Sequence, residues 1–141
     1  RIETAVDIAA PPAAVWRVLV DFASYPEWNP FVRGIEGEAR VGARLRVTVQ
    51  PPGRKAMTFR PTVCAAEPGR ELRWLGRVLI PGLFDGEHSF VLEPSGASCR
   101  LRHEERFTGL LAGAFPGMLA DTAKGFEALN AALARRVESA T

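Results

Sequence analysis

The C-terminal stretch constrains the fold most, because it carries the longest periodic apolar pattern in the chain. In residues 115–138, FPGMLADTAKGFEALNAALARRVE, apolar side chains recur every three or four residues and charged side chains occupy the remaining circumference. This spacing predicts an amphipathic helix of more than 20 residues with one buried side. The predicted stripe consists of Phe115, Leu119, Thr122, Phe126, Leu129, Leu133 and Val137. Such a helix needs a long apolar surface to cover that stripe.

The preceding segment predicts that surface. Residues 31–107 favour six strands, one of them over residues 57–63, separated by breaks such as QPPGRK, AEPGRE and EPSGAS. Because the connections are of hairpin length, an antiparallel meander with an arginine-rich outer face is expected. Alternation assigns to the inner face Phe31, Arg33, Ile35, Leu45, Val47, Val49, Met57, Phe59, Val63, Leu72, Trp74, Val78, His88, Phe90, Leu92, Leu101, His103, Glu105 and Phe107.

The N-terminal residues predict one more strand and one or two short helices. Residues 2–8 alternate between apolar and polar side chains, which is typical of a half-buried strand. Residues 12–22, PAAVWRVLVDF, show helical spacing and begin with a proline, which suits a first helical turn. In residues 24–30, SYPEWNP, the prolines leave room for one helical turn at most. We expect Trp28 to close one end of the space between sheet and long helix, or else to contact a ligand there.

These elements together predict one α+β domain over residues 1–141. A seven-stranded antiparallel sheet is expected to curve around the long C-terminal helix, with the short helices following strand one. A helix held in this way leaves a volume that loops and side chains must fill, and incomplete filling produces a pocket. Gly125, in the middle of the long helix, is expected to make room for a neighbour or a ligand.

Charge and composition exclude several classes of function. With 18 basic and 16 acidic residues, the net charge of +2 does not favour a nucleic-acid groove. The most apolar run, residues 110–120, is too short for a membrane span. Cys64 and Cys99 lie in segments predicted as non-neighbouring strands, so reduced thiols and a cytoplasmic location are expected.

The order of these elements resembles the helix-grip fold of the START and Bet v 1-like superfamily, especially its bacterial polyketide cyclase/dehydrase-like and lipid-transport branch. The resemblance rests on AAPPAAVWRVLVDFASYPEWNPFV, on GEHSFVLEPSGASCRLRHEERFTGLL and on the closing helix. It implies a deep, mainly apolar cavity for a lipid, polyketide or other aromatic molecule. It implies no single reaction, because the scaffold serves binders, carriers, cyclases and interaction proteins.

Three polar residues are the candidates for catalysis. His88, His103 and Glu105 share the parity of inward-facing apolar residues, so alternation points two imidazoles and a carboxylate toward the helix. Burial there favours a general acid/base acting on a carbonyl or hydroxyl group. The alternative is structural: Glu105 pairs with Arg33 or another cation, and the histidines bond to backbone or water.

The candidate ligand-binding residues are mainly aromatic and apolar, and each is also explained as ordinary core. They are Trp28, Phe31, Met57, Phe59, Trp74, Phe84, His88, Phe90, His103, Glu105, Met118, Leu119, Thr122 and Phe126. The sequence has no cluster with metal-ligand spacing, no phosphate-binding glycine loop and no dinucleotide fingerprint. We therefore expect no metal and no cofactor.

Three functions follow as hypotheses. The first is binding of a hydrophobic or aromatic small molecule between sheet and helix, for transport or sequestration. The second is a cyclase or dehydratase that uses Glu105 and a histidine as acid/base. The third is a protein-interaction role like that of co-chaperone or quinone-related relatives. The expected partner is a hydrophobic small molecule, with no nucleic acid and no integral membrane association, and the chain is expected to be a monomer or homodimer.

Overall fold

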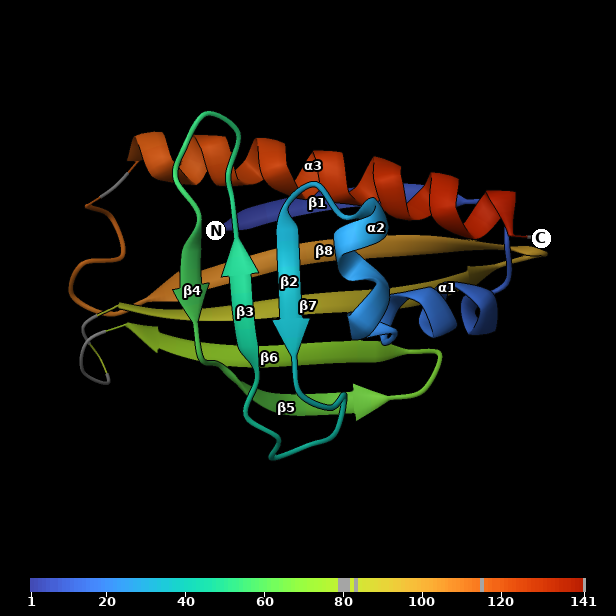
Figure 1. Ribbon diagram of the computed structural model, residues 1–141, viewed down its shortest axis with the longest axis horizontal. Helices are drawn as coiled ribbons and strands as arrows, with labels where there is room; N and C mark the ends of the chain where they lie inside the picture. The colour runs from blue at the N-terminus through green and yellow to red at the C-terminus, as the bar shows by residue number, and fades with distance from the viewer. Residues whose placement is uncertain (79–81, 83, 115, 141) are drawn as a thin grey trace.

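The computed structural model describes residues 1–78, 82, 84–114 and 116–140, with the side chains of Val78 and Phe84 outside the described part. Strands dominate the middle of the chain and helices lie at both ends (Figure 1). The elements are β1 (Ile2–Ile8), α1 (Pro12–Leu19), the 3₁₀ turn η1 (Phe22–Ser24), α2 (Tyr25–Trp28), β2 (Val32–Glu36), β3 (Arg46–Val49), β4 (Met57–Phe59), β5 (Thr62–Glu67), β6 (Glu71–Val78), β7 (Phe84–Ser95), β8 (Ser98–Thr108) and α3 (Pro116–Ser139).

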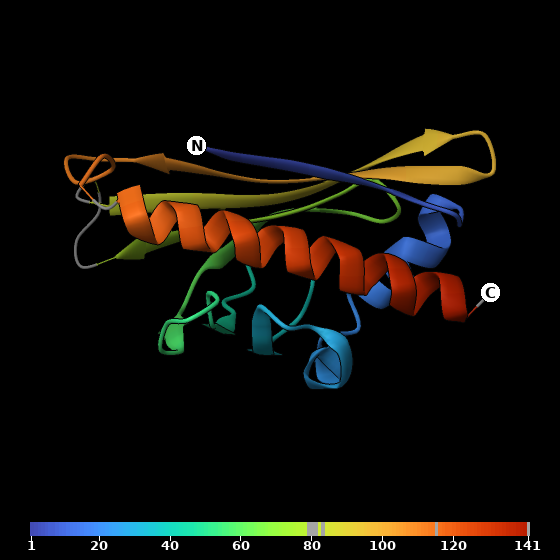
Figure 2. The same ribbon diagram turned by 90° about the horizontal axis from the view of Figure 1, so that it is seen from above.

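The strands form two antiparallel sheets in the described part of the chain. The larger has five strands in the order β1-β8-β7-β6-β5, and the smaller has three in the order β2-β3-β4. In Figure 1 the strands of the small sheet cross in front of the large sheet, and in Figure 2 α3 runs along the opening between them. The long helix therefore lies across the apolar side of the strands, as the sequence predicts.

The prediction of a single seven-stranded sheet is wrong, because the segment predicted as one strand over residues 57–63 forms two. β4 ends at Phe59 and β5 begins at Thr62, on either side of Pro61, which has no N–H to donate to a ladder. The two sheets stay joined at this corner: Gly42 N donates to Val63 O at 2.9 Å, and Leu45 N donates to Pro61 O at 2.8 Å.

A second correction concerns Arg33, which alternation assigns to the inner face and which is exposed. The pairing of β2 with β3 shifts register between Val32 and Gly34, so strict alternation fails at this point. Phe31, Val32 and Ile35 are buried instead. Arg33 Nη1 donates to the carbonyl oxygen of Asn29 at 3.1 Å.

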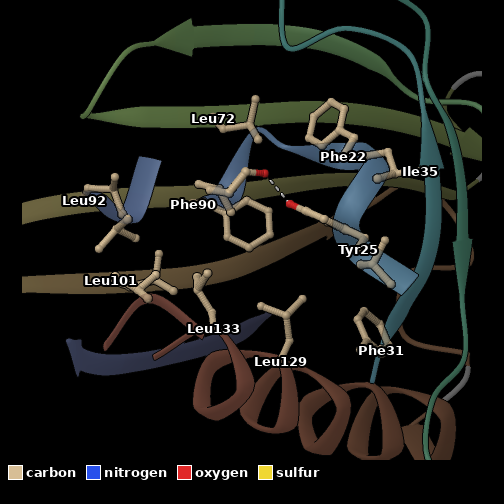
Figure 3. Packing of buried hydrophobic residues seen from close by; sticks show 14 of the residues in the cluster. Phe22, Tyr25, Phe31, Ile35, Leu72, Phe90, Leu92, Leu101, Leu129 and Leu133 are labelled. Carbon is tan, nitrogen blue, oxygen red and sulfur yellow. Dashed lines mark hydrogen bonds between the residues drawn. The ribbon is translucent and has the colours of Figure 1, made fainter. Parts of the chain in front are cut away.

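The core is best packed under the C-terminal part of α3. Phe126, Leu129, Leu133 and Val137 are buried there, which confirms this part of the predicted stripe, whereas Phe115 lies outside the described residues. Figure 3 shows Leu129 and Leu133 facing side chains from the large sheet and from the segment around α2. The hydroxyl of the buried Tyr25 donates to the Leu19 carbonyl oxygen, which holds α2 against α1 (Figure 3).

The state of the cysteines and the length of the apolar helices were also predicted from the sequence. Cys64 and Cys99 are both free thiols, as predicted. No helix within the described ranges is both long and apolar enough to cross a membrane.

Candidate functional site

A cavity of about 240 Å³ lies beneath the N-terminal part of α3, between that helix and strands of both sheets. Its wall is almost entirely apolar. The lining residues are Phe31, Val47, Val49, Pro51, Met57, Phe59, Pro61, Trp74, Gly76, Gly86, His88, Glu105, Phe107, Met118, Leu119 and Thr122. The large sheet, the small sheet and α3 each contribute, so the cavity depends on the whole arrangement.

The space stays open because the surrounding side chains do not reach across it. Met118, Leu119 and Thr122 on α3 are only partly buried, unlike the residues of the helix's second half. In the large sheet, Gly76 of β6 pairs directly with Gly86 of β7, so two neighbouring lining positions carry no side chain. The two sheets and the helix thus border a volume that their own residues leave unfilled.

A chain of polar side chains leads from the cavity wall into the core. Glu105 Oε1 lies 3.4 Å from Nδ1 of His88, and Nε2 of His88 lies 2.6 Å from Nε2 of His103. Nδ1 of His103 lies 2.8 Å from Oδ1 of Asn130, whose Nδ2 donates to Thr4 Oγ1 at 2.8 Å. The chain therefore links the cavity to α3 and to β1. One hydrogen-bonded unit thus joins residues far apart in the sequence, and Glu105 contacts it at His88.

His103 is the deepest member of this chain. Its ring stacks on Phe126 with centroids 3.9 Å apart and on Phe90 at 4.3 Å. Burial lowers the pKa of His103 well below its usual range, and the neighbouring His88 lowers it further. His103 is therefore a neutral imidazole at neutral pH, with one nitrogen protonated and the other free to accept a hydrogen bond.

Glu105 lies next to a glycine that makes room for it. A Cβ added to Gly86 would overlap Oε2 of Glu105. The pairing of β7 with β8 places His88 directly opposite Glu105, which brings the carboxylate to the imidazole. The structural alternative named Arg33 as a partner, but within the described residues Glu105 faces His88 instead.

Nine of the fourteen sequence-predicted ligand-binding residues line the cavity: Phe31, Met57, Phe59, Trp74, His88, Glu105, Met118, Leu119 and Thr122. Phe90, His103 and Phe126 are fully buried behind that wall, and Trp28 packs against Tyr25 with ring centroids 5.1 Å apart. Phe84 begins β7, and its side chain lies outside the described residues. Contact with a ligand remains a prediction for all of them.

Sequence reasoning missed seven lining residues: Val47, Val49, Pro51, Pro61, Gly76, Gly86 and Phe107. Val47, Val49 and Phe107 were on the predicted inner face, so the same alternation could have placed them. The two glycines carry no such signal, because their importance comes from being paired across two strands. Asn130 was also missed, since one amide in an apolar helix stripe does not reveal its partner.

An ion pair lies beside the cavity. Arg54 Nε, in the connection between β3 and β4, is 2.6 Å from Asp121 Oδ2 on α3. The pair joins the small sheet to the helix near Pro51 and Met118 of the lining. Among the described residues, no group of three or more His, Cys, Asp or Glu side chains is placed to hold a metal ion.

The chain is similar to known proteins in sequence and in fold. The family model described as polyketide cyclase / dehydrase and lipid transport matches residues 1–138. A START superfamily protein from Mycobacterium smegmatis is 25% identical, with 99% of this chain and 98% of that chain covered and a TM-score of 0.76. TTHA0849 from Thermus thermophilus is 21% identical over 99% and 98% of the two chains, with a TM-score of 0.77.

An enzyme structure is also similar. The Zhui aromatase/cyclase from Streptomyces sp. R1128 is 21% identical, with 97% of this chain and 92% of that chain covered and a TM-score of 0.74. At this identity the likeness concerns the fold. No curated protein matches the sequence significantly.

Proposed function

The chain belongs to the polyketide cyclase / dehydrase and lipid transport family, and we propose that it binds a hydrophobic or aromatic small molecule in the cavity under α3, for transport or sequestration. The observation that carries this proposal is the cavity itself, about 240 Å³ of space with an almost wholly apolar lining. Apolar concavities with a few polar groups are the usual form of small-molecule sites.

The cavity volume suggests the size of a suitable ligand. An apolar cavity of about 150 Å³ is large enough to hold benzene. The larger space here accommodates two fused rings, and naphthalene is therefore a suitable probe. Burial of its apolar surface supplies the binding free energy, at about 25 cal/mol for each Å² removed from water.

The methionines provide a direct test. The sequence contains two, and both line the cavity, Met57 from β4 and Met118 from α3. With ¹³C-labelled methionine methyl groups, the protein gives two resonances, and naphthalene in the cavity shifts both through its ring currents. Resonances that stay in place at saturating naphthalene would reject binding at this site.

A filled cavity is the matched control. Thr122 lines the cavity from the partly exposed side of α3, so Thr122→Trp introduces an indole ring into the space. The variant is expected to fold, by circular dichroism, and to lose the naphthalene-induced shifts. Shifts that persist unchanged in this variant would place the probe elsewhere.

A second candidate function is favoured by one observation, the contact between Glu105 and His88 at the cavity wall. A carboxylate and an imidazole at 3.4 Å can exchange a proton with a bound ketone. Cyclase and dehydratase reactions begin with removal of a proton from the carbon next to a carbonyl group. In this role Glu105 takes that proton, and His88 holds the carboxylate in place.

Proton exchange into 2-tetralone, a bicyclic ketone, tests this role without knowledge of the natural substrate. In deuterated water, the enzyme role predicts exchange at the carbon next to the carbonyl group that is faster with the protein than in buffer. Glu105→Gln should abolish the acceleration while 2-tetralone still shifts the methionine resonances. Equal exchange with and without the protein would reject the enzyme role and leave the binding role intact.

A further inference from the structure

The direction of every hydrogen bond in the buried chain follows from Thr4. Its hydroxyl donates to the carbonyl oxygen of His103 at 2.7 Å, so the single hydroxyl hydrogen is used. Thr4 Oγ1 therefore accepts from the amide Nδ2 of Asn130. This fixes the orientation of the Asn130 amide, and its Oδ1 faces His103 as an acceptor.

The orientation of the Asn130 amide decides which ring nitrogen of each histidine carries the proton. His103 Nδ1 must carry a proton, because its partner is the Oδ1 acceptor of Asn130. Burial lowers the pKa of His103 and keeps the ring neutral, so its Nε2 is an acceptor. His88 Nε2 therefore donates to His103, and only Nδ1 of His88 remains to face Glu105.

The Glu105 carboxyl group faces His88 through Oε1, which lies 3.4 Å from Nδ1. Both oxygens of a carboxylate carry lone pairs, so the second oxygen, Oε2, is available as an acceptor. Oε2 accepts no hydrogen bond from the described residues and lies beside Gly86, in the cavity wall.

The other polar groups of the described lining do not supply a cation. Thr122 donates its hydroxyl hydrogen to the Met118 carbonyl oxygen at 2.8 Å, so only its lone pairs remain. The indole N–H of Trp74 is an uncharged donor, and no lining residue of the described chain is lysine or arginine. A carboxylate or phosphate in the cavity would lose its hydration without a charged partner.

We infer that Glu105 is the specificity-determining residue of the cavity: Oε2 accepts a hydrogen bond from a hydroxyl group of an uncharged apolar ligand, and carboxylates and phosphates are excluded. The inference rests on the proposed binding function and narrows its ligand class. With Glu105 in its wall, the cavity binds neutral hydroxylated molecules in preference to free fatty acids and anionic lipids. An apolar cavity without this carboxylate would not discriminate between them.

Three probes of the same ring system test it: naphthalene, 2-naphthol and 2-naphthoate, titrated at neutral pH against the methionine methyl resonances. 2-Naphthol should bind about two- to tenfold more tightly than naphthalene, the range for one net hydrogen bond. 2-Naphthoate should bind at least about tenfold more weakly than 2-naphthol. Naphthoate binding as tightly as naphthol would overturn the inference and leave the binding function standing. Failure of all three probes to bind would reject the binding function itself.

Two variants assign the selectivity to Glu105. Glu105→Gln places an amide N–H₂ donor at the cavity wall, and it should lower the naphthol-to-naphthoate affinity ratio at least about threefold. Gly86→Ala adds a methyl group where Oε2 now lies, so the flexible carboxylate must move, and the same ratio should fall. A ratio that is unchanged in both variants would show that Glu105 does not determine specificity.

Gly76→Ala is the matched control for Gly86→Ala. Gly76 is the cross-strand partner of Gly86 and lines the same cavity. A Cβ at Gly76 would meet nothing nearer than Pro61 Cβ at 3.7 Å, which is ordinary contact. The added methyl group should therefore change the affinities for all three probes by a similar factor and leave the ratio unchanged. A ratio that falls as far in this control would attribute the effect to volume and contradict the role of Glu105.

Discussion

Replacing Gly125 with alanine tests how closely α3 is held against the rest of the fold. Alanine in the interior of a helix is ordinarily more stable than glycine by about 1 kcal/mol. At this position, however, an added Cβ would overlap the ring of Phe31, with the ring's Cε1 at 2.8 Å and Cγ at 3.1 Å. The structure therefore predicts that Gly125→Ala destabilises the protein, whereas helix propensity alone predicts that it stabilises it.

The magnitude follows from the surroundings of that ring. Phe31 is 3% exposed and packs edge-on against Phe126, with centroids 5.4 Å apart. Three ring atoms are close to the new Cβ, so the ring that lines the cavity must move as a whole. Overpacking of this kind costs about 1–3 kcal/mol. After subtraction of the propensity gain of about 1 kcal/mol, Gly125→Ala should lower the free energy of unfolding by about 0–2 kcal/mol.

Urea unfolding measures this change, with an unchanged m-value as the sign that the two states remain comparable. Gly117→Ala in the same helix is the control, because its Cβ would meet only Arg54 Nη2 at 3.6 Å. That variant should be as stable as the parent or more stable, by no more than about 1 kcal/mol. In a Phe31→Leu background, Gly125→Ala should cost less. If Gly125→Ala stabilised the protein as much as Gly117→Ala, the inferred close contact between helix and ring would be refuted.

Three further predictions concern the polar groups. Burial lowers the pKa of His103 in the folded state, so stability present above about pH 6.5 should be lost as the pH falls below it, by up to about 1.4 kcal/mol per pH unit; urea unfolding between pH 7.5 and 5 checks this, and a flat profile contradicts it. Asn130→Ala leaves the His103 N–H and Thr4 without their partner and should lower the free energy of unfolding by about 1–3 kcal/mol, measured in the same assay. The Arg54–Asp121 pair is partly exposed, so a double-mutant cycle at physiological salt should give a coupling energy of no more than about 1 kcal/mol.

The local elements of the fold were predictable because their signals lie within a few consecutive residues. The helix predicted over residues 115–138 is observed as Pro116–Ser139, and the single turn allowed in SYPEWNP is α2. Both follow from side-chain periodicity and from the fixed backbone angle of proline. Alternation likewise assigned His88, His103 and Glu105 to the inner face, where the structure has them.

The errors arose where distant parts of the chain meet. The alternation pattern did not take account of Pro61, so it predicted one strand where the structure has β4 and β5, in different sheets. The pattern also does not reveal the register shift between Val32 and Gly34, which leaves Arg33 exposed. Side-chain parity describes a regular strand and contains no information on where pairing with a neighbour breaks.

By itself, the sequence determined which segments are strands and helices and which side of each is apolar, since these depend on neighbours along the chain. Only the tertiary structure decided that His88 lies opposite Glu105, that Asn130 orients both imidazoles, and that Gly76 and Gly86 meet in the cavity wall. Those features depend on strand register and on the position of α3 over the sheets. Because register and docking are settled by packing between residues far apart in the chain, no local pattern contains them.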